Sequence, residues 1–318
     1  MSVSLSHIRS AARRIEGRVV RTPLRHSPWL SGLSGGEVFL KLETLQPTFS
    51  YKIRGAFNAV LTLVEERGGD VPALVTASAG NHGRALAHAA REAGLALTVY
   101  VPEHAPRIKV DAIRRTGAEV RPCRDYDEAE LKAKAHAATG SALFVSPYSH
   151  PGVIAGAGTV GLEILEERPG MDTLVVPIGG GGLISGIATA ASQLPGKTVV
   201  VGVEVEASSA FTQALAAGRI VTIDVGPTLA DGLGGNLDPE TVTFDIVRRL
   251  VSSIMLVGEP ALAEAVAGVA REERLIAEGA GAAGAAAVIT APRNFKGQRT
   301  AVVLSGANIN LETLKALI

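Results

Sequence analysis

Lys52 is the side chain in this 318-residue sequence whose surroundings point most directly to chemistry. It stands among Phe49, Tyr51 and Ile53, a setting that predicts a partly buried amine. Burial lowers the pKa of an amine toward the neutral form, which can attack an aldehyde. The alternative interpretation is a solvated polar patch that Lys52 shares with Arg54.

A run of four glycines, Gly179 to Gly182, ends at Leu183 and joins an apolar strand to a predicted helix. Its bare backbone can approach a phosphate, which the amides and the positive end of the helix can bind. A tight turn that only packs a strand against a helix is the alternative. A buried lysine together with a phosphate-binding turn predicts a cofactor held as a Schiff base.

Two more polar turns follow apolar segments. Ser78-Ala79-Gly80-Asn81-His82 brings a hydroxyl, an amide and an imidazole together, and Ser305-Gly306-Ala307-Asn308 places a hydroxyl after the last apolar strand. Polar groups on loops of a rigid scaffold are disproportionately functional, so the first turn is predicted to bind a small polar ligand. The alternatives are a capped helix start with a solvated His82, and an isolated turn at Ser305.

The elements that must position these turns follow a regular order. Short β-branched runs alternate with helical patterns that begin near residues 83, 107 and 183, and the predicted strands cover 73–77, 97–101, 173–177, 198–204 and 301–304. This order predicts βαβ units and an α/β fold with mostly parallel sheets flanked by helices. Such sheets bind their ligands at the carboxyl ends of the strands, where the turns lie.

Composition narrows the class of protein. Hydrophobic residues make up 47% of the chain, and 31 basic residues balance 31 acidic ones, so no surface for nucleic acid or anionic membranes is predicted. No apolar run reaches the roughly 18 residues of a membrane span. The single cysteine, Cys123, forms no intrachain disulfide, and the N-terminal arginines do not fit a signal peptide. We therefore expect a soluble cytoplasmic enzyme with a small-molecule substrate.

Taken in order, these segments resemble the four signatures of fold-type II pyridoxal-phosphate enzymes, whose architecture is that of the tryptophan synthase β chain. The resemblance runs from about Thr22 to the C-terminus and rests on residues 46–56, 78–83, 179–183 and 305–308. It is strongest to the short serine/threonine dehydratases, a branch that includes serine racemase. Together the four motifs are highly specific, although each alone is not.

The resemblance implies a role for each matching residue. Lys52 forms the Schiff base with pyridoxal 5'-phosphate and then removes the Cα proton of the substrate. Asn81 bonds the ring hydroxyl, Gly179 to Gly182 with Leu183 hold the phosphate, and Ser305 faces the ring nitrogen. The substrate carboxylate lies against the turn made of Ser78, Ala79, Asn81 and His82.

The resemblance also implies the organisation of the chain and its reaction. Residues 1–72 and 148–318 form a large cofactor-binding domain, and residues 73–147 form a small mobile domain. The protein is a lyase that converts a β-hydroxy amino acid to a 2-keto acid and ammonia, and it is a homodimer. Threonine, serine, phenylserine and 3-hydroxyaspartate all remain open as substrates.

Several positions depart from the family pattern. Ala79 replaces the serine that serves racemases as a second base, which predicts dehydration without efficient racemisation. Glu204 matches one ligand of the metal-dependent relatives, but Ala210 stands where their aspartate is expected, so no metal is predicted; a solvated Glu204 at a strand end is the alternative. Four further departures from the pattern are Phe49, Ser149, His150 and Ala157. They either reshape the substrate pocket or lie in loops away from the substrate. Glu278 near the cofactor has no assigned role.

Three other functions stay open at this point. The same fold supports serine racemases and β-replacement synthases, which add a thiol or an amine after elimination. If the protein were a nicotinamide-dependent oxidoreductase, the four glycines would form the dinucleotide-binding turn. Glu204 and Glu206, about 20 residues further on, would be the candidate ribose-binding acids. That interpretation leaves Lys52 and Ser305 without a function.

Overall fold

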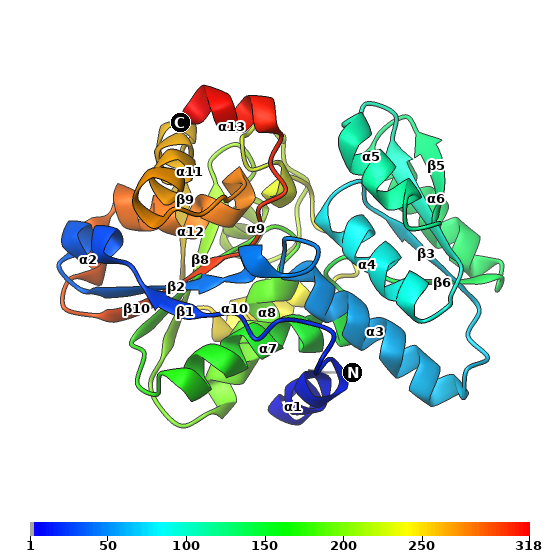
Figure 1. Ribbon diagram of the computed structural model, residues 1–318, viewed down its shortest axis with the longest axis horizontal. Helices are drawn as coiled ribbons and strands as arrows, with labels where there is room; N and C mark the ends of the chain where they lie inside the picture. Colours follow the sequence, from blue (N-terminus) through cyan, green and yellow to red (C-terminus); the bar gives the residue numbers. More distant parts are fainter. Residues whose placement is uncertain (1–2) are drawn as a thin grey trace.

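The computed structural model describes residues 3–318, which form two β-sheets flanked by helices (Figure 1). The larger sheet has six strands, all parallel except β1, and its spatial order is β1 (Leu24–His26), β2 (Glu37–Leu42), β10 (Arg299–Leu304), β7 (Thr173–Pro177), β8 (Val199–Val205) and β9 (Ser253–Val257). This confirms the α/β class with mostly parallel sheets.

The smaller sheet has four parallel strands from one continuous stretch of the chain. Their order is β5 (Glu119–Cys123), β4 (Leu97–Pro102), β3 (Ala73–Ala77) and β6 (Ala142–Phe144). Three helices connect these strands, namely α4 (Asn81–Glu92), α5 (Arg107–Arg114) and α6 (Tyr126–Ala138). They form the right-hand part of the molecule in Figure 1.

Two layers of helices cover the six-stranded sheet. Side chains of α2 (Pro28–Ser34), α11 (Glu259–Glu273) and α12 (Gly279–Thr290) fill the core on one face. On the other face the core comes from α7 (Pro151–Glu167), α8 (Gly182–Gln193) and α10 (Thr243–Leu250). The remaining helices are α1 (Leu5–Arg14), α3 (Lys52–Arg67), α9 (Ala210–Ala217) and α13 (Leu311–Leu317), with short 3₁₀ turns at Glu43–Leu45, Asp231–Leu233 and Pro292–Phe295.

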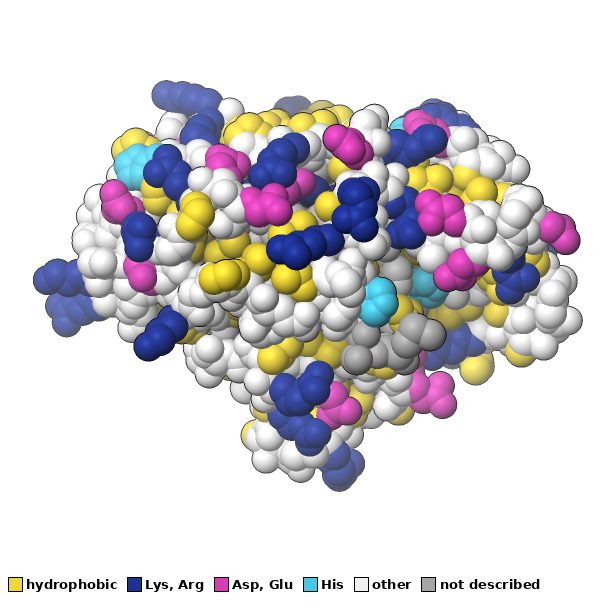
Figure 2. Space-filling view, turned by 90° about the horizontal axis from the view of Figure 1, so that it is seen from below, with side chains coloured by type: hydrophobic (Ala, Val, Ile, Leu, Met, Phe, Trp, Pro, Cys, Tyr) yellow, Lys and Arg dark blue, Asp and Glu magenta, His cyan; other side chains and the backbone are white. Residues whose placement is uncertain are grey.

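Small residues let α7 and α8 pack closely behind the site. A Cβ on Gly186 would lie 2.4 Å from the carbonyl oxygen of Ile154, so that position has no room for a side chain. Between residues 3 and 318 no helix is both long and apolar enough to cross a membrane. On the face drawn in Figure 2, basic side chains stand singly or in small groups with acidic side chains among them.

Candidate active site

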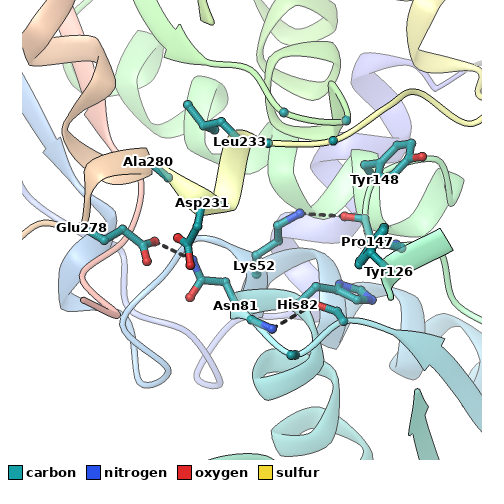
Figure 3. Close-up of a pocket in the computed structure, with 18 of the residues that line it drawn as sticks. Lys52, Asn81, His82, Tyr126, Pro147, Tyr148, Asp231, Leu233, Glu278 and Ala280 are labelled. Carbon is teal, nitrogen blue, oxygen red and sulfur yellow. Dashed lines mark hydrogen bonds between the residues drawn. The ribbon is translucent and has the colours of Figure 1, made fainter. Parts of the chain in front are cut away.

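A cavity of about 450 Å³ lies between the two sheets, and all four predicted motifs contribute to its lining. Lys52 comes from the start of α3, and loops at the carboxyl ends of β3, β7 and β10 supply the other predicted residues. The 3₁₀ turn at 231–233 and Glu278 face them (Figure 3). This is the edge at which open α/β sheets place their ligands.

Lys52 begins α3 and points into this cavity. Its Nζ lies 2.8 Å from the carbonyl oxygen of Pro147, to which it donates a hydrogen bond. Burial lowers the pKa of the amine to about 8, although the negative charge of Glu278 opposes that shift. Burial therefore increases the fraction of Lys52 that is neutral near physiological pH, which is the form that a nucleophile and base requires.

The glycine loop connects β7 to α8 and takes a shape that side chains would block. A Cβ on Gly180 would lie 2.3 Å from the ring of Tyr148, and Gly181 has a φ of +83°. Gly182 also lies against Tyr148, since a Cβ there would be 2.9 Å from its Cα. Because these residues carry no side chains, their backbone lines the cavity at the N-terminus of α8, where an anion is favoured.

Asn81 and Glu278 meet although they are far apart in the sequence. Asn81 Nδ2 donates to Glu278 Oε1 at 2.5 Å, and its Oδ1 accepts from Asn308 Nδ2 at 2.6 Å. Burial raises the pKa of Glu278 to about 7, and the nearby Asp231 adds to that rise. The two bonds fix which way the Asn81 amide faces.

His82 is buried, so the alternative of a solvated imidazole is wrong. Its Nε2 lies 3.3 Å from the carbonyl oxygen of Val145, while its Nδ1 has no partner in the described structure. Burial, reinforced by the charge of Lys52, lowers the pKa of His82 to about 3, so the ring is neutral. Ser78 and Ala79 line the cavity beside it, and Ser78 Oγ accepts a bond from the amide of Gly80.

Ser305 follows β10 and completes the lining on the side of the large sheet. Its side chain is nearly buried, and its Oγ lies 3.4 Å from the carbonyl oxygen of Ala280. The amide of Tyr51 donates to the carbonyl oxygen of Ser305 at 3.0 Å. That backbone bond ties the start of α3 to the loop after β10, so Lys52 and Ser305 are held in a fixed relation.

These residues fit pyridoxal phosphate on their own chemistry. The cavity offers one amine with a lowered pKa, a glycine loop at a helix N-terminus for a phosphate, and an oriented amide for a ring hydroxyl. The unpartnered Nδ1 of buried His82 shows that the lining has hydrogen-bonding capacity the protein alone does not use. The group would be held by Lys52, Asn81, Ser305 and the glycine loop.

Residues 15–306 match the protein family described as pyridoxal-phosphate dependent enzyme. The chain belongs to this family. The L-threonine ammonia-lyase of Thermotoga maritima is 40% identical over 99% of this chain and 78% of its own. The beta-hydroxyaspartate dehydratase of Paracoccus denitrificans is 35% identical over 96% of each chain. The maize serine racemase structure superposes with a TM-score of 0.91 at 32% identity, covering 99% of this chain and 97% of the other.

This family membership confirms pyridoxal 5'-phosphate as the cofactor and the fold-type II architecture. The protein is a pyridoxal-phosphate-dependent lyase of the serine/threonine dehydratase family. The nicotinamide-dependent oxidoreductase is thereby excluded. The two curated relatives described above are named an ammonia-lyase and a dehydratase, and these names support lyase activity.

Besides the solvated alternative for His82, the structure corrects two interpretations made from the sequence. Arg54 is fully buried in an ion-pair cluster, so it shares no solvated patch with Lys52. Glu204 does end a strand, but it is 1% exposed and bonded to α9, so the alternative of a solvated carboxylate is wrong. Among residues 3–318 no group of three or more His, Cys, Asp or Glu side chains could hold a metal ion.

The other unusual positions lie outside the cavity lining. His150 caps α7 by accepting the amide of Gly152, and Ser149 Oγ accepts the amide of Val242. Phe49 has a φ of 59°, and the guanidinium of Arg84 lies 5.0 Å from the centre of its ring. Ala157 belongs to α7 and packs into the core on that face of the large sheet.

Sequence reasoning missed several residues of the site. Tyr148 supports the glycine loop, and Asp231 binds Lys109 of α5 at 2.6 Å across the cavity mouth. Lys134 of α6 binds Asp238 at 2.7 Å. None of these contacts has a local sequence signal, because the two ion pairs join residues 122 and 104 positions apart and Tyr148 lies on a different segment from the glycine loop.

Proposed function

We propose that the protein converts a β-hydroxy amino acid with an uncharged side chain, threonine first and serine second, to a 2-keto acid and ammonia. The observation that carries the proposal is the convergence of Lys52, Asn81, the glycine loop and Ser305 on one cavity. Relatives named L-threonine ammonia-lyase support threonine as the substrate.

The chain's own residues divide the work of this reaction. Pyridoxal phosphate, when bound, supplies an aldehyde for Schiff-base exchange and a conjugated ring that takes up the charge left when the Cα proton departs. Lys52 holds that aldehyde until the substrate amine replaces it, and its freed Nζ then removes the Cα proton. The proton that Nζ has taken from Cα can leave with the β-hydroxyl as water. Lys52 then takes back the aldehyde and releases the enamine, whose hydrolysis gives the keto acid and ammonia.

The groups around Lys52 orient the reactants. Glu278 and Asn308 fix the Asn81 amide so that one of its N–H bonds remains for the ring hydroxyl. Ser305 faces the ring nitrogen as a neutral hydroxyl. Ser78, Asn81 and the neutral His82 surround the substrate carboxylate without adding a competing negative charge.

The charges of the lining support an uncharged substrate side chain. Besides Lys52, the only lysine or arginine among the described lining residues is Lys109, and its amine is bound to Asp231. A second carboxylate, as in 3-hydroxyaspartate, would meet Asp231 and Glu278 without a free cation to pair with. Transfer of such a charge from water would then be unfavourable.

Ala79 supports elimination over racemisation. Racemisation needs an acid or base on the face of the substrate opposite Lys52, and a methyl group supplies none. We propose that interconversion of L- and D-serine is far slower than keto-acid release. A β-replacement reaction remains the second candidate on this fold, and added thiol would reveal it.

A keto-acid release assay tests the proposal directly. L-threonine, L-serine, D-serine, phenylserine and threo-3-hydroxyaspartate are compared, with Lys52→Ala as the inactive control. We expect kcat/KM to be highest for L-threonine and lowest for 3-hydroxyaspartate. Preference for 3-hydroxyaspartate, rapid chiral inversion of serine, or a thioether product in the presence of thiol would each contradict one part of the proposal.

Three broader features are proposed on the same basis. The unit formed by residues 73–147 is a small mobile domain over a large domain of 1–72 and 148–318, and the pairs Lys109–Asp231 and Lys134–Asp238 hold it closed. Charge reversal at Lys134 should open the unit and be visible by small-angle scattering. We also propose a cytoplasmic homodimer, which light scattering and imaging of a tagged chain can test.

A further inference from the structure

Glu204 is a buried carboxylate that the reaction described above does not use. It lies in β8 next to β7, the strand that leads into the glycine loop. Its Oε1 accepts the amide of Phe211 at 2.7 Å, and its Oε2 accepts the amide and the hydroxyl of Thr212 at 2.8 and 2.6 Å. Both oxygens are thus committed to the first turn of α9, where a negative charge stabilises a helix.

The helix that Glu204 holds also supports the glycine loop. Phe211 is fully buried, and its ring presses on Gly181 so closely that a Cβ there would lie 2.5 Å from Cζ. On another side of the loop, Thr243 Oγ1 donates to the carbonyl oxygen of Gly180 at 2.8 Å, and the ring of Tyr148 covers the same glycine. The loop is therefore fixed by contacts from several elements.

We propose that Glu204 is a positioning residue for the cofactor phosphate, acting through α9 and Phe211 on the conformation of Gly181. Gly181 adopts a left-handed φ and precedes the first residue of α8, so its conformation sets where the loop amides point. A loop held in the binding conformation loses less conformational freedom when the phosphate binds. Glu204 thus contributes to cofactor affinity without touching the cofactor.

The proposal rests on the glycine loop being the phosphate site and predicts a dependence on that one group. The full-length chain is stripped of cofactor and reloaded with pyridoxal phosphate or with pyridoxal, which has the same ring and aldehyde but no phosphate. For Glu204→Gln we expect the Kd for pyridoxal phosphate to rise about tenfold or more, because one α9 amide then faces an NH₂ group. The Kd for pyridoxal should stay within about twofold of the wild type.

Two further variants separate positioning from general stability. Phe211→Leu keeps the helix but withdraws the ring from Gly181, and it should reproduce the selective loss even if Glu204→Gln folds poorly. Glu273→Gln is the matched control, since Glu273 is also buried but binds Arg25 and Ser27 at the end of α11. It should lower thermal stability and leave the ratio of the two Kd values unchanged.

Four results would overturn the inference. Equal losses for pyridoxal phosphate and pyridoxal would give Glu204 a purely structural role, and unchanged Kd values would give it none. A weaker wild-type affinity after treatment with EDTA would mean that Glu204 serves a bound cation instead. A wild-type chain that binds both compounds equally would instead refute the phosphate assignment of the glycine loop, on which the proposal depends.

Discussion

Lys52 and Arg54 stand two residues apart at the start of α3, yet their side chains occupy opposite kinds of environment. Arg54 is fully buried and donates to both oxygens of Glu43, to both oxygens of Glu163, to Thr159 and to the carbonyl oxygen of Val20. Lys52 reaches the cavity and makes one hydrogen bond, to Pro147.

The difference shows that Arg54 stabilises the fold, whereas Lys52 remains accessible to a ligand in the cavity. Arg54 and Lys41 together balance Glu43 and Glu163, so the cluster is neutral and its donors are satisfied. On the cavity side the pKa of Lys52 is lowered by burial, and His82 keeps an unpartnered nitrogen. The first turn of α3 thus carries one side chain whose hydrogen-bond donors are all paired and one that faces a cavity with unused hydrogen-bonding capacity.

Lys52→Ala should produce the largest effect and confine it to the reaction. Because the proposed function assigns both the Schiff-base amine and the Cα base to Lys52, its loss should reduce kcat/KM for L-threonine by about 10⁴-fold or more. The free energy of unfolding of the cofactor-free chain, measured in urea, should change little because Lys52 makes one hydrogen bond. Residual activity above about a hundredth of the wild type would contradict its assignment.

Arg54→Met should do the reverse. Removal of the guanidinium leaves Glu43 buried without its main partner, which should lower the free energy of unfolding by about 3–5 kcal/mol. Burial raises the pKa of Glu43, but Arg54 and Thr22 outweigh it and hold that pKa below its usual value. Wild-type stability from this group is therefore lost as pH falls, whereas the variant should gain stability as Glu43 becomes protonated. Urea unfolding at several pH values checks the sign.

The pH dependence of cofactor capture sharpens the contrast at Lys52. Only the neutral amine attacks the aldehyde, and burial lowers the pKa of Lys52 to about 8. The rate of Schiff-base formation by the cofactor-free chain should rise about tenfold per pH unit below 8 and then level off. Absorbance of the Schiff base after rapid mixing measures it, and a profile centred near 10.5, the ordinary lysine value, would refute it.

Thr159→Val should have the smallest effect and test how finely the Arg54 cluster is tuned. The hydroxyl accepts from Arg54 Nη1 at 3.1 Å and donates to the carbonyl oxygen of Gly156 at 2.6 Å. Its loss should cost about 1 kcal/mol in the free energy of unfolding while kcat/KM stays within about twofold. A larger loss of activity than of stability would show that the cluster also positions Lys52.

The interior strands show what the sequence could predict and where patterns fail. Apolar runs identified β3, β4, β7, β8 and β10, all of which lie inside a sheet. The unpredicted β1, β5, β6 and β9 are the sheet edges, where residues such as those of Glu119–Cys123 are mostly exposed. The interior strand β2 was not predicted because Lys41 interrupts its apolar run. Lys41 can be buried there because it forms an ion pair with Glu163.

The residues of the site also fall into those that local motifs predict and those that only the folded structure reveals. The structure brings Lys52, Asn81, the glycine loop and Ser305 to one cavity, because motifs at strand ends follow from local sequence and parallel topology. The bond from Asn81 to Glu278 joins residues 197 positions apart, one at the start of α4 and the other immediately before α12, so no local pattern predicts it. The support that Tyr148 gives to Gly180 likewise has no local pattern.

The pairing of β2 with β10 has a consequence for how the chain folds during its synthesis. Glu37 of β2 lies opposite Arg299 of β10, so β2 can pair with β1 early but with β10 only when nearly the whole chain has been synthesised. The four-stranded sheet, drawn from residues 73–144, can assemble long before that. Closure of so long a loop slows the final step. Ser305 follows β10 directly, so this part of the cavity lining is added only with the last strand of the chain.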